Sequence, residues 1–380
     1  MAAADSLRPI AAAELAERRR TVAAHLADRG LQAAVLSDPA NVRYLGGFAL
    51  TQPWMSRTRP TVAVLDADGR LTVVASTAVA LDDPPVDEVV PYTAPSNMPD
   101  AVAGVLARRG LGGAPVATER GHEHRLGMTV AELEEIERLH TDRFEDAGPS
   151  LWAARIVKSP AEIDRLRAAF AACDRIYARL FAGELRAGES ERALARRISR
   201  MMLEEGADEP GWVMLTSGAG SYGRLLSTPR QRVIERGEMV WLDLAARVDG
   251  YWSDHSRAGI VGCEPTAEQV ELQSRVVAAT QAGIAAVRPG VALGEVAAAA
   301  TLAGESVPGR VGHGVGLATT EPPDVVTGSD ETAVPGMVFT IEPLAVREYG
   351  MFQAEAVLTV TDDGCELLTH APEAISAVPG

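Results

Sequence analysis

Two aspartates flank a predicted hairpin in the stretch VWLDLAARVDGYWSDHSR, residues 240–257. The Asp249-Gly250 dipeptide between two strand-like runs is a strong signal for a two-residue turn. That turn places Ala245 opposite Asp254, and because side chains alternate along a strand, Asp243 is expected on the same face. Two carboxylates held that close are costly unless one is protonated or a cation lies between them. The pattern therefore indicates a metal site.

Three further residues could complete such a site. His313 lies in GHGVG, Glu342 ends the apolar run MVFTIE, and Glu355 lies in FQAEAVLTV. A loop centred on residues 348–349 would place Glu342 and Glu355 opposite each other. Two Asp, two Glu and one His can hold two divalent ions, and these hard ligands suit Mn, Co, Fe or Zn. Two such ions, roughly 3.5–4 Å apart, can activate a water for attack on a carbonyl. Taken singly, each residue has an ordinary structural explanation.

The elements that must position these residues occupy the second part of the chain, residues 151–380. Helical patterns alternate there with strand-like apolar runs, which is typical of helices on one face of a mostly antiparallel sheet, an α+β domain. The expected helices are residues 160–182, 189–205 and 266–287, and the expected strands are residues 212–216, 239–245, 337–342 and 354–360.

Residues 1–150 are expected to form a smaller α/β domain, because helical patterns and short buried strands alternate there. The expected helices are residues 11–30, 100–109 and 129–138, and the expected strands are residues 33–38, 61–65 and 71–75.

The composition excludes several classes of partner. The 380-residue chain has a net charge of −16, so nucleic acid and anionic membranes are not expected partners. The three cysteines are odd in number and widely spaced, which fits a reducing cytoplasm. We expect no signal peptide and no membrane-spanning run.

Taken together, these motifs resemble the "pita-bread" family of creatinase, prolidase, aminopeptidase P and methionine aminopeptidase. The family order is Asp, Asp eleven residues later, His in GHGxG, Glu in an FTIEP run, and a final strand Glu. Upstream, SDPANVRYLGGF (residues 37–48) is similar to the family's amino-terminal domain. IVKSPAEIDRLRAA (residues 156–169) is similar to the opening of its catalytic domain. The resemblance covers nearly the whole chain.

The resemblance implies a pita-bread catalytic domain behind a creatinase-type amino-terminal domain, and a homodimer. It implies two divalent metal ions held by Asp243, Asp254, His313, Glu342 and Glu355. Among these, Glu342 is expected as the proton shuttle and His313 as its catalytic neighbour. The implied reaction is hydrolysis of a C–N bond in a short peptide, as in an Xaa-Pro dipeptidase or aminopeptidase, by a hydroxide that bridges the two metals.

Three positions depart from the family pattern. Leu226 and Thr320 stand where the peptidases usually have histidines, and Gln353 stands where the late strand usually has Arg. In the family these histidines position the substrate and stabilise the tetrahedral intermediate. Loss of such a donor costs about 10²–10³ in rate. Either the alignment is locally shifted, or a water-mediated contact replaces the histidines, or the substrate has changed.

The remaining substrate-site candidates are arginines and a tryptophan. Arg257 follows the second aspartate and is expected either to steady the site or to contact substrate. Trp54, Arg57 and Arg59 occupy a stretch that reaches into a neighbouring subunit's site in creatinase-type proteins. An exposed Trp with two Arg could bind a carboxylate, or the stretch could be a surface loop.

Three functions therefore stay open. The first is an Xaa-Pro peptidase. The second is a hydrolase or lyase for a small non-peptide metabolite on the same dinuclear scaffold, which the substituted Leu226 and Thr320 would suit. The third is a catalytically silent binding module, against which the retention of all five candidate ligands argues.

Overall fold

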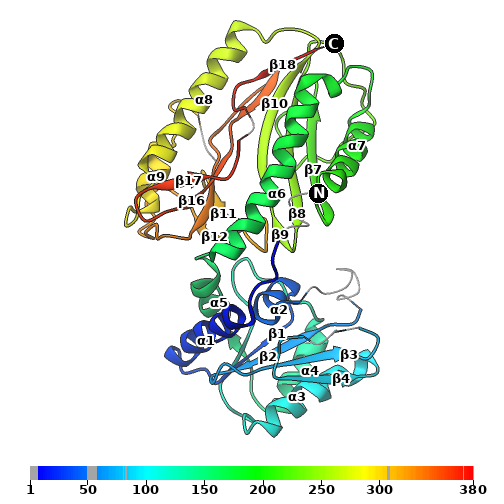
Figure 1. The fold of residues 1–380 in the computed structure, drawn as a ribbon, viewed down its shortest axis with the longest axis vertical. Helices are drawn as coiled ribbons and strands as arrows, with labels where there is room; N and C mark the ends of the chain where they lie inside the picture. The colour runs from blue at the N-terminus through cyan, green and yellow to red at the C-terminus, as the bar shows by residue number, and fades with distance from the viewer. Residues whose placement is uncertain are drawn as a thin grey trace. The chain divides into compact units, whose positions relative to one another are not determined.

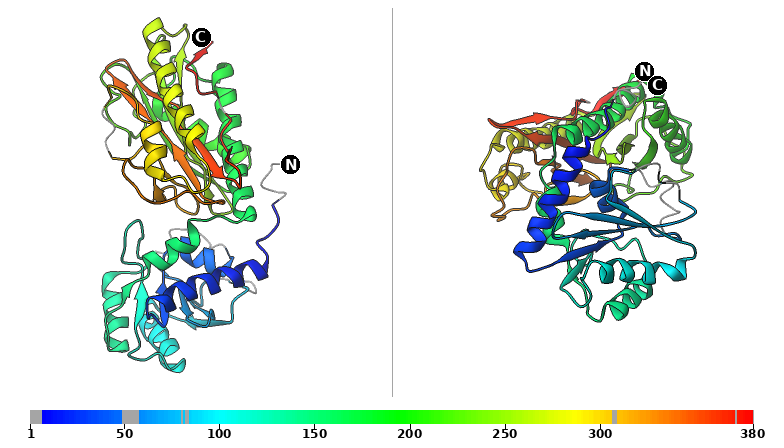
Figure 2. Two further views of the ribbon diagram at one scale, coloured as in Figure 1. Left: turned by 90° about the vertical axis from the view of Figure 1, so that its left-hand side faces the viewer. Right: turned by 60° about the horizontal axis from the view of Figure 1, so that its bottom comes forward.

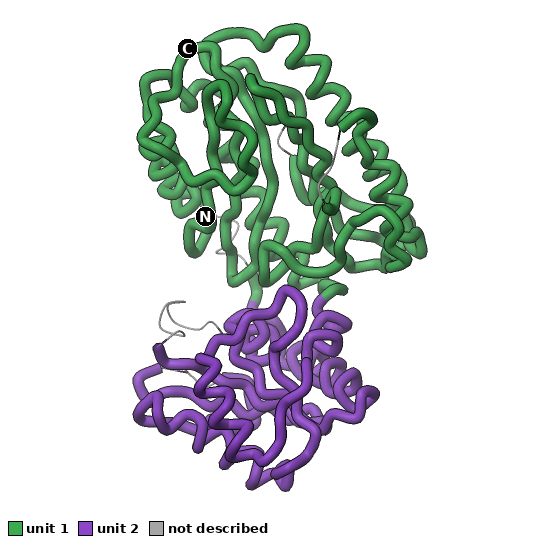
Figure 3. Tube along the Cα trace, turned by 180° about the vertical axis from the view of Figure 1, so that it is seen from behind, with its two compact units in different colours: residues 1–8, 156–380 green, residues 9–155 purple. Residues whose placement is uncertain are grey.

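The computed structural model describes residues 7–48, 58–79, 81, 84–305, 309–370 and 372–379. The chain divides into two compact units (Figure 3). One unit spans Pro9–Arg155, and the other begins at Ile156 and includes the segment before Pro9. Leu7 packs on the second unit's core, and Arg165 Nη2 donates to the carbonyl of Arg8 at 2.8 Å. Among the described residues, no helix is both long and apolar enough to cross a bilayer.

The unit Pro9–Arg155 is built on a mixed six-stranded sheet with the order β4-β3-β2-β1-β5-β6. Both faces of its central strands are buried, which explains their continuous apolar sequences. The strands are β1 (Ala33–Leu36), β2 (Val62–Asp66), β3 (Leu71–Ser76), β4 (Glu88–Tyr92), β5 (Val116–Thr118) and β6 (Glu145–Asp146). The helices are α1 (Ala12–Asp28), α2 (Pro39–Gly46), the 3₁₀ turn η3 (Pro95–Asn97), α3 (Met98–Arg108), α4 (Val130–His140) and α5 (Gly148–Arg155).

The described strands of the second unit form two five-stranded sheets and a two-stranded ribbon rather than the single sheet expected from the sequence. The first has the order β18-β10-β8-β7 with β9 beside β8, and the second has the order β12-β11-β13-β16-β17. Their strands are β7 (Glu209–Ser217), β8 (Met239–Val248), β9 (Tyr251–Trp252), β10 (His255–Val261), β11 (His313–Gly314), β12 (Glu321–Asp324), β13 (Val338–Ile341), β16 (Ala356–Val360), β17 (Cys365–Leu367) and β18 (Ser376–Val378). A further ribbon pairs β14 (Leu344–Arg347) with β15 (Gly350–Gln353).

Helices cover these sheets (Figure 1). They are α6 (Pro160–Arg179), its terminal π turn η4 (Leu180–Glu184), α7 (Glu191–Glu204), α8 (Ala267–Ala286) and α9 (Leu293–Ala299). Helix α6 begins at a capping box between Ser159 and Glu162, with proline at its first position. Cys173, Ile176 and Tyr177 of α6 form one core with α7, β7 and β8.

Helix α8 (yellow in Figure 2) packs against the β14–β15 ribbon and against β13. Leu272, Val276 and Ala279 on this helix share a core with residues of β8, β10 and β15. Ile284, near its end, packs instead with α9, β13 and β16. A capping box from Thr266 starts the helix. The α+β architecture expected for this part of the chain is confirmed, although the single expected sheet is replaced by two five-stranded sheets and a ribbon.

Candidate active site

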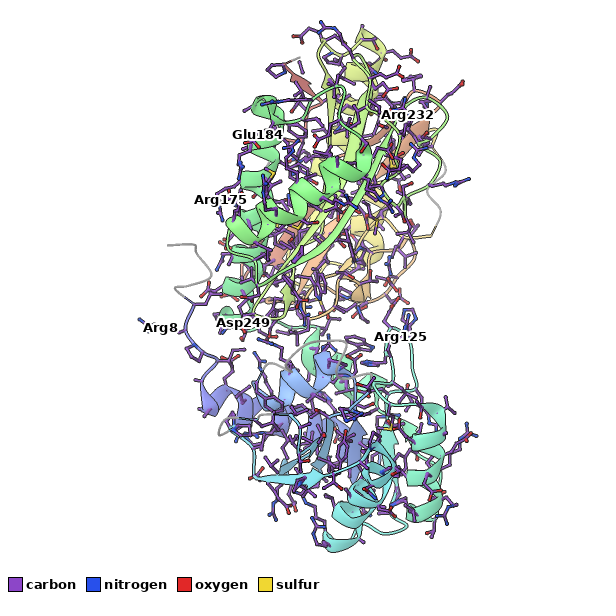
Figure 4. The ribbon with its side chains drawn as sticks, turned by 90° about the vertical axis from the view of Figure 1, so that its right-hand side faces the viewer. Arg8, Arg125, Arg175, Glu184, Arg232 and Asp249 are labelled. Atoms are coloured by element: carbon purple, nitrogen blue, oxygen red, sulfur yellow. The ribbon has the colours of Figure 1, made fainter. Side chains whose placement is uncertain are left out.

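The first pair of acids comes from the hairpin formed by β8 and β10. Asp249 (φ 46°) and Gly250 (φ 84°) both have positive φ, which is the geometry of a type I′ turn. Figure 4 labels Asp249 at the end of this hairpin. Leu244 pairs with His255, and in this register the preceding residue, Asp254, lies opposite Ala245. The predicted turn and register are therefore confirmed, and the carboxylates of Asp243 and Asp254 lie close enough for their charges to interact.

The second pair of acids comes from the strand pairs that follow. Ile341 pairs with Ala356 in one sheet and Leu344 with Gln353 in the ribbon, so Glu342 and Glu355 lie directly across from each other between these pairs. The loop falls at residues 348–349, as predicted.

His313 reaches the same place because two glycines let its strand pass close to its neighbours. A Cβ at Gly312 would lie 2.0 Å from the carbonyl oxygen of Thr340, and one at Gly314 would lie 2.2 Å from that of Pro322. The backbone N–H of His313 donates to Thr340 Oγ1 at 3.0 Å. Its Nδ1 lies 3.0 Å from the carbonyl oxygen of Gly314. This assigns the proton to Nδ1 and leaves the lone pair of Nε2 available.

The five side chains converge on one cavity of about 260 Å³. Nε2 of His313 lies 3.3 Å from Glu342 Oε1 and 3.8 Å from Asp254 Oδ2. One ligand atom each from Asp254, His313 and Glu355 lies within 4.8 Å of the others. Asp243 also lines the cavity. Donor atoms this close, with a lone pair aimed at carboxylates, are arranged as they would be around a cation.

The electrostatics of the cluster support this interpretation. Burial raises the pKa of Asp243 to about 6. Burial, together with the charges of Asp243 and Glu342, raises the pKa of Asp254 well above its usual range. Burial and the charges of Asp254 and Glu342 do the same to the pKa of Glu355, whose Oε1 is buried without a hydrogen-bond partner. A bound divalent cation would favour the charged forms and satisfy that oxygen. The residues therefore fit a metal centre.

The residues that replace the two family histidines lie at this cavity. Thr320 lines it and is half-buried, and Leu226 lines it with 82% of its surface exposed. Both residues therefore belong to the wall around the acids, and Leu226 also borders a neighbouring cavity.

Arg257 is buried behind the site and is not among the described residues that line the cavity. It is 1% exposed, and its Nη1 donates to the backbone carbonyls of Ser256 and Glu355 at 2.7 Å each. Of the two expected roles, this placement favours steadying the site, by holding the strand of Glu355, over substrate contact.

The amino-terminal candidates lie in the other unit. Arg59 is half-buried and donates to the carbonyl of Thr58 at 2.8 Å. Trp54 and Arg57 lie outside the described residues.

Two tryptophans of the cavity, Trp212 and Trp241, and the adjacent Thr340 escaped the sequence reasoning, whereas Gln353 is one of the three positions that depart from the family pattern. Trp212 Nε1 lies 3.5 Å from Asp243 Oδ1, and Thr340 Oγ1 donates to Glu342 Oε1 at 3.2 Å. Gln353 accepts from Trp241 Nε1 at 3.2 Å and donates from Nε2 to Glu342 Oε2 at 3.2 Å. The alternation of β13 places Thr340 on the face of Glu342, a signal that could have found it. The indoles carried no comparable signal.

The cavity's apolar wall consists of Trp212, Met214, Leu225, Leu226, Trp241 and Leu344.

Comparison with known families agrees with this geometry. Residues 164–362 match Metallopeptidase family M24, and residues 18–157 match the Creatinase/Prolidase N-terminal domain. The chain belongs to metallopeptidase family M24. The family resemblance and the pita-bread architecture expected from the sequence are confirmed. As an M24 protein the chain is a metal-dependent hydrolase of peptide bonds, and the family implies divalent metal binding. The non-peptide alternative and the silent binding module are not favoured.

Individual M24 relatives align over almost the entire chain. A probable dipeptidase PepE of Mycobacterium tuberculosis is 32% identical over 390 residues, covering 96% of each chain. An Xaa-Pro dipeptidase of Lactobacillus delbrueckii subsp. lactis is 27% identical and covers 93% of this chain and 97% of the relative. The crystal structure of dipeptidase PepE from Mycobacterium ulcerans superposes with a TM-score of 0.84 at 27% identity, covering 98% of this chain and 100% of that one.

Proposed function

We propose that this M24 protein is a dipeptidase that hydrolyses Xaa-Pro peptides with two divalent metal ions. The observation that carries the proposal is the convergence of four buried or half-buried carboxylates and the Nε2 lone pair of His313 on one cavity. The relatives described as dipeptidases and an Xaa-Pro dipeptidase support the substrate class.

The ligands would be Asp243, Asp254, His313, Glu342 and Glu355. Hard oxygen ligands with one imidazole suit Mn, Co, Fe or Zn. When bound, such a pair of ions activates a water and polarises the scissile carbonyl.

The chain's own residues supply orientation and proton handling. Glu342 is the proposed general base and acid, because its Oε1 lies beside His313 and both its oxygens are held by neighbours. Thr340 and Gln353 fix that carboxylate from its two sides. The apolar wall limits the water that reaches the cavity and offers a surface for a proline ring.

Thr320 and Leu226 should make this enzyme slower than relatives with histidines at those positions. Threonine donates a hydrogen bond without a positive charge, and leucine donates none. Loss of a donor aimed at the transition state costs about 10²–10³ in rate.

We also propose a cytoplasmic location and a homodimer. The three cysteines, Cys173, Cys263 and Cys365, are all free, which fits a reducing compartment. The dimer rests on the family resemblance, and sedimentation of the purified protein tests it: a monomer across the micromolar range would contradict it.

Turnover of Xaa-Pro dipeptides with added Mn or Co tests the function. Wild-type protein should release free proline, and Asp254→Ala should abolish release and lower the bound metal. Asp164→Ala is the matched control, because Asp164 is an exposed α6 carboxylate paired with Arg167. Metal-loaded protein that leaves all Xaa-Pro dipeptides intact would contradict the proposal.

A further inference from the structure

Both polar atoms of the Gln353 amide have partners in the wall of the cavity. Its Oε1 accepts from Trp241 Nε1 and its Nε2 donates to Glu342 Oε2, both at 3.2 Å. An amide held in this way orients Glu342, and it carries no charge with which to attract an anion. The position where the late strand usually offers a guanidinium therefore cannot hold a substrate carboxylate here.

Arg310 is the one Lys or Arg side chain among the described residues that line this cavity. It lies three positions before His313, the first residue of β11, and its side chain is 31% exposed. Its Nη1 donates to Asp324 Oδ1 at 2.6 Å. That contact uses one of the five N–H donors of a planar guanidinium and restrains its orientation.

The rest of the wall is unsuited to an anion. Apart from Arg310 and the five proposed metal ligands, the described wall consists of Thr320, Gln353 and apolar side chains, none of which carries a positive charge. Guanidinium groups bind carboxylates through two parallel N–H bonds, which gives both attraction and direction. Among the described lining residues, an anionic group on the substrate thus finds a matching side chain only at Arg310.

We propose that Arg310 is the specificity-determining residue that binds a carboxylate of the substrate, with Asp324 as the residue that positions it. This inference rests on the proposed peptidase function. The carboxylate is either the terminal one of a dipeptide or an acidic side chain, and the two sources predict different substrate preferences. A terminal carboxylate would make the enzyme a dipeptidase that discriminates against blocked or longer peptides.

The experiment compares wild type and R310Q on three substrates: Ala-Pro, Ala-Pro-amide and Glu-Pro-amide. R347Q is the matched control, because Arg347 also pairs with a carboxylate, Glu305, at 35% side-chain exposure and does not belong to the described cavity lining. We expect R310Q to raise KM for carboxylate-bearing substrates about 10–100-fold while kcat and the Ala-Pro-amide reaction change little. R310K keeps the positive charge but cannot form two parallel hydrogen bonds to a carboxylate, so its KM for carboxylate-bearing substrates should lie between those of wild type and R310Q.

The pattern of loss identifies the source of the carboxylate. A selective loss on Ala-Pro assigns Arg310 to the terminal carboxylate, and a selective loss on Glu-Pro-amide assigns it to an acidic side chain. Equal effects on all three substrates, or no effect in folded R310Q, would overturn the inference.

A second readout separates this inference from the proposed function. If wild-type protein hydrolyses none of the peptides, the proposed function fails. Calorimetric binding of the same peptides to the metal-loaded protein then decides the inference, and affinities that R310Q leaves unchanged overturn it. The same binding measurement applies if either variant melts well below wild type.

Discussion

Replacement of Asp243 by asparagine should stabilise the metal-free protein above neutral pH while abolishing hydrolysis. Burial raises the pKa of this carboxyl from 3.8 to about 6, because the charged form loses hydration. Asparagine has nearly the same shape and no charge, and its side-chain oxygen can still accept from Trp212 Nε1. The variant therefore removes the destabilisation that a buried, ionised Asp243 causes in the metal-free folded state, at the expense of activity.

The size and pH dependence of this effect follow from linkage. An acid whose pKa is raised on folding favours the folded state fully below its unfolded pKa near 4, and this contribution is lost as pH rises through about 6. Each unit of pKa difference corresponds to about 1.36 kcal/mol, so ionised Asp243 costs about 3 kcal/mol at pH 8. Because Asp243 faces the cavity and is partly exposed, solvent screening makes this an upper figure.

Calorimetry of chelator-treated protein measures the effect. A free-energy gain of about 3 kcal/mol raises the melting temperature of a domain of this size by about 6–12 °C. We expect that shift for Asp243→Asn at pH 8 and a much smaller one near pH 4.5. Asp164→Asn, at an exposed carboxylate, should show neither. A metal-free Asp243→Asn protein that melts below wild type at pH 8 would refute the reasoning.

Three further predictions concern the surroundings of the site. Lys158→Met should cost about 3–5 kcal/mol in urea unfolding, because Lys158 Nζ and Glu321 Oε1 form a 2.8 Å pair at 1% exposure, and adding Glu321→Gln should recover most of the loss. Thr320→His should raise kcat on Xaa-Pro dipeptides about tenfold or more in steady-state assays. An unchanged kcat would contradict the claim that the missing histidine at this position slows hydrolysis. Gly312→Ala should weaken metal binding in titration calorimetry, because its Cβ would lie 2.0 Å from the Thr340 carbonyl oxygen, whereas Gly364→Ala, with open space around it, should not.

Local turn chemistry explains why the acids could be placed from the sequence. The Asp249-Gly250 dipeptide fixes the turn type, the turn fixes the register, and the register fixes which face Asp243 and Asp254 share. The same logic aligned Glu342 with Glu355 across the loop at residues 348–349.

The division of the second unit's strands into two five-stranded sheets and a ribbon could not be predicted from local turn residues. Strand patterns show which face of each strand is buried, but not which sheet that strand joins. The packing of α8 against both sheets depends on contacts between residues far apart in the chain. The hydrogen bonds of Gln353 with Trp241 and Glu342, and the placement of Arg310 in the cavity wall, depend on the same long-range assembly.

Elemental analysis of the purified protein, combined with proline release by the same samples, tests the central claim most directly. Wild type should bind two divalent ions per chain and release proline from Xaa-Pro dipeptides, with both properties lost together in Asp254→Ala. Hydrolysis that persists after complete removal of metal, or a wild-type chain that takes up no divalent ion at neutral pH, would contradict it.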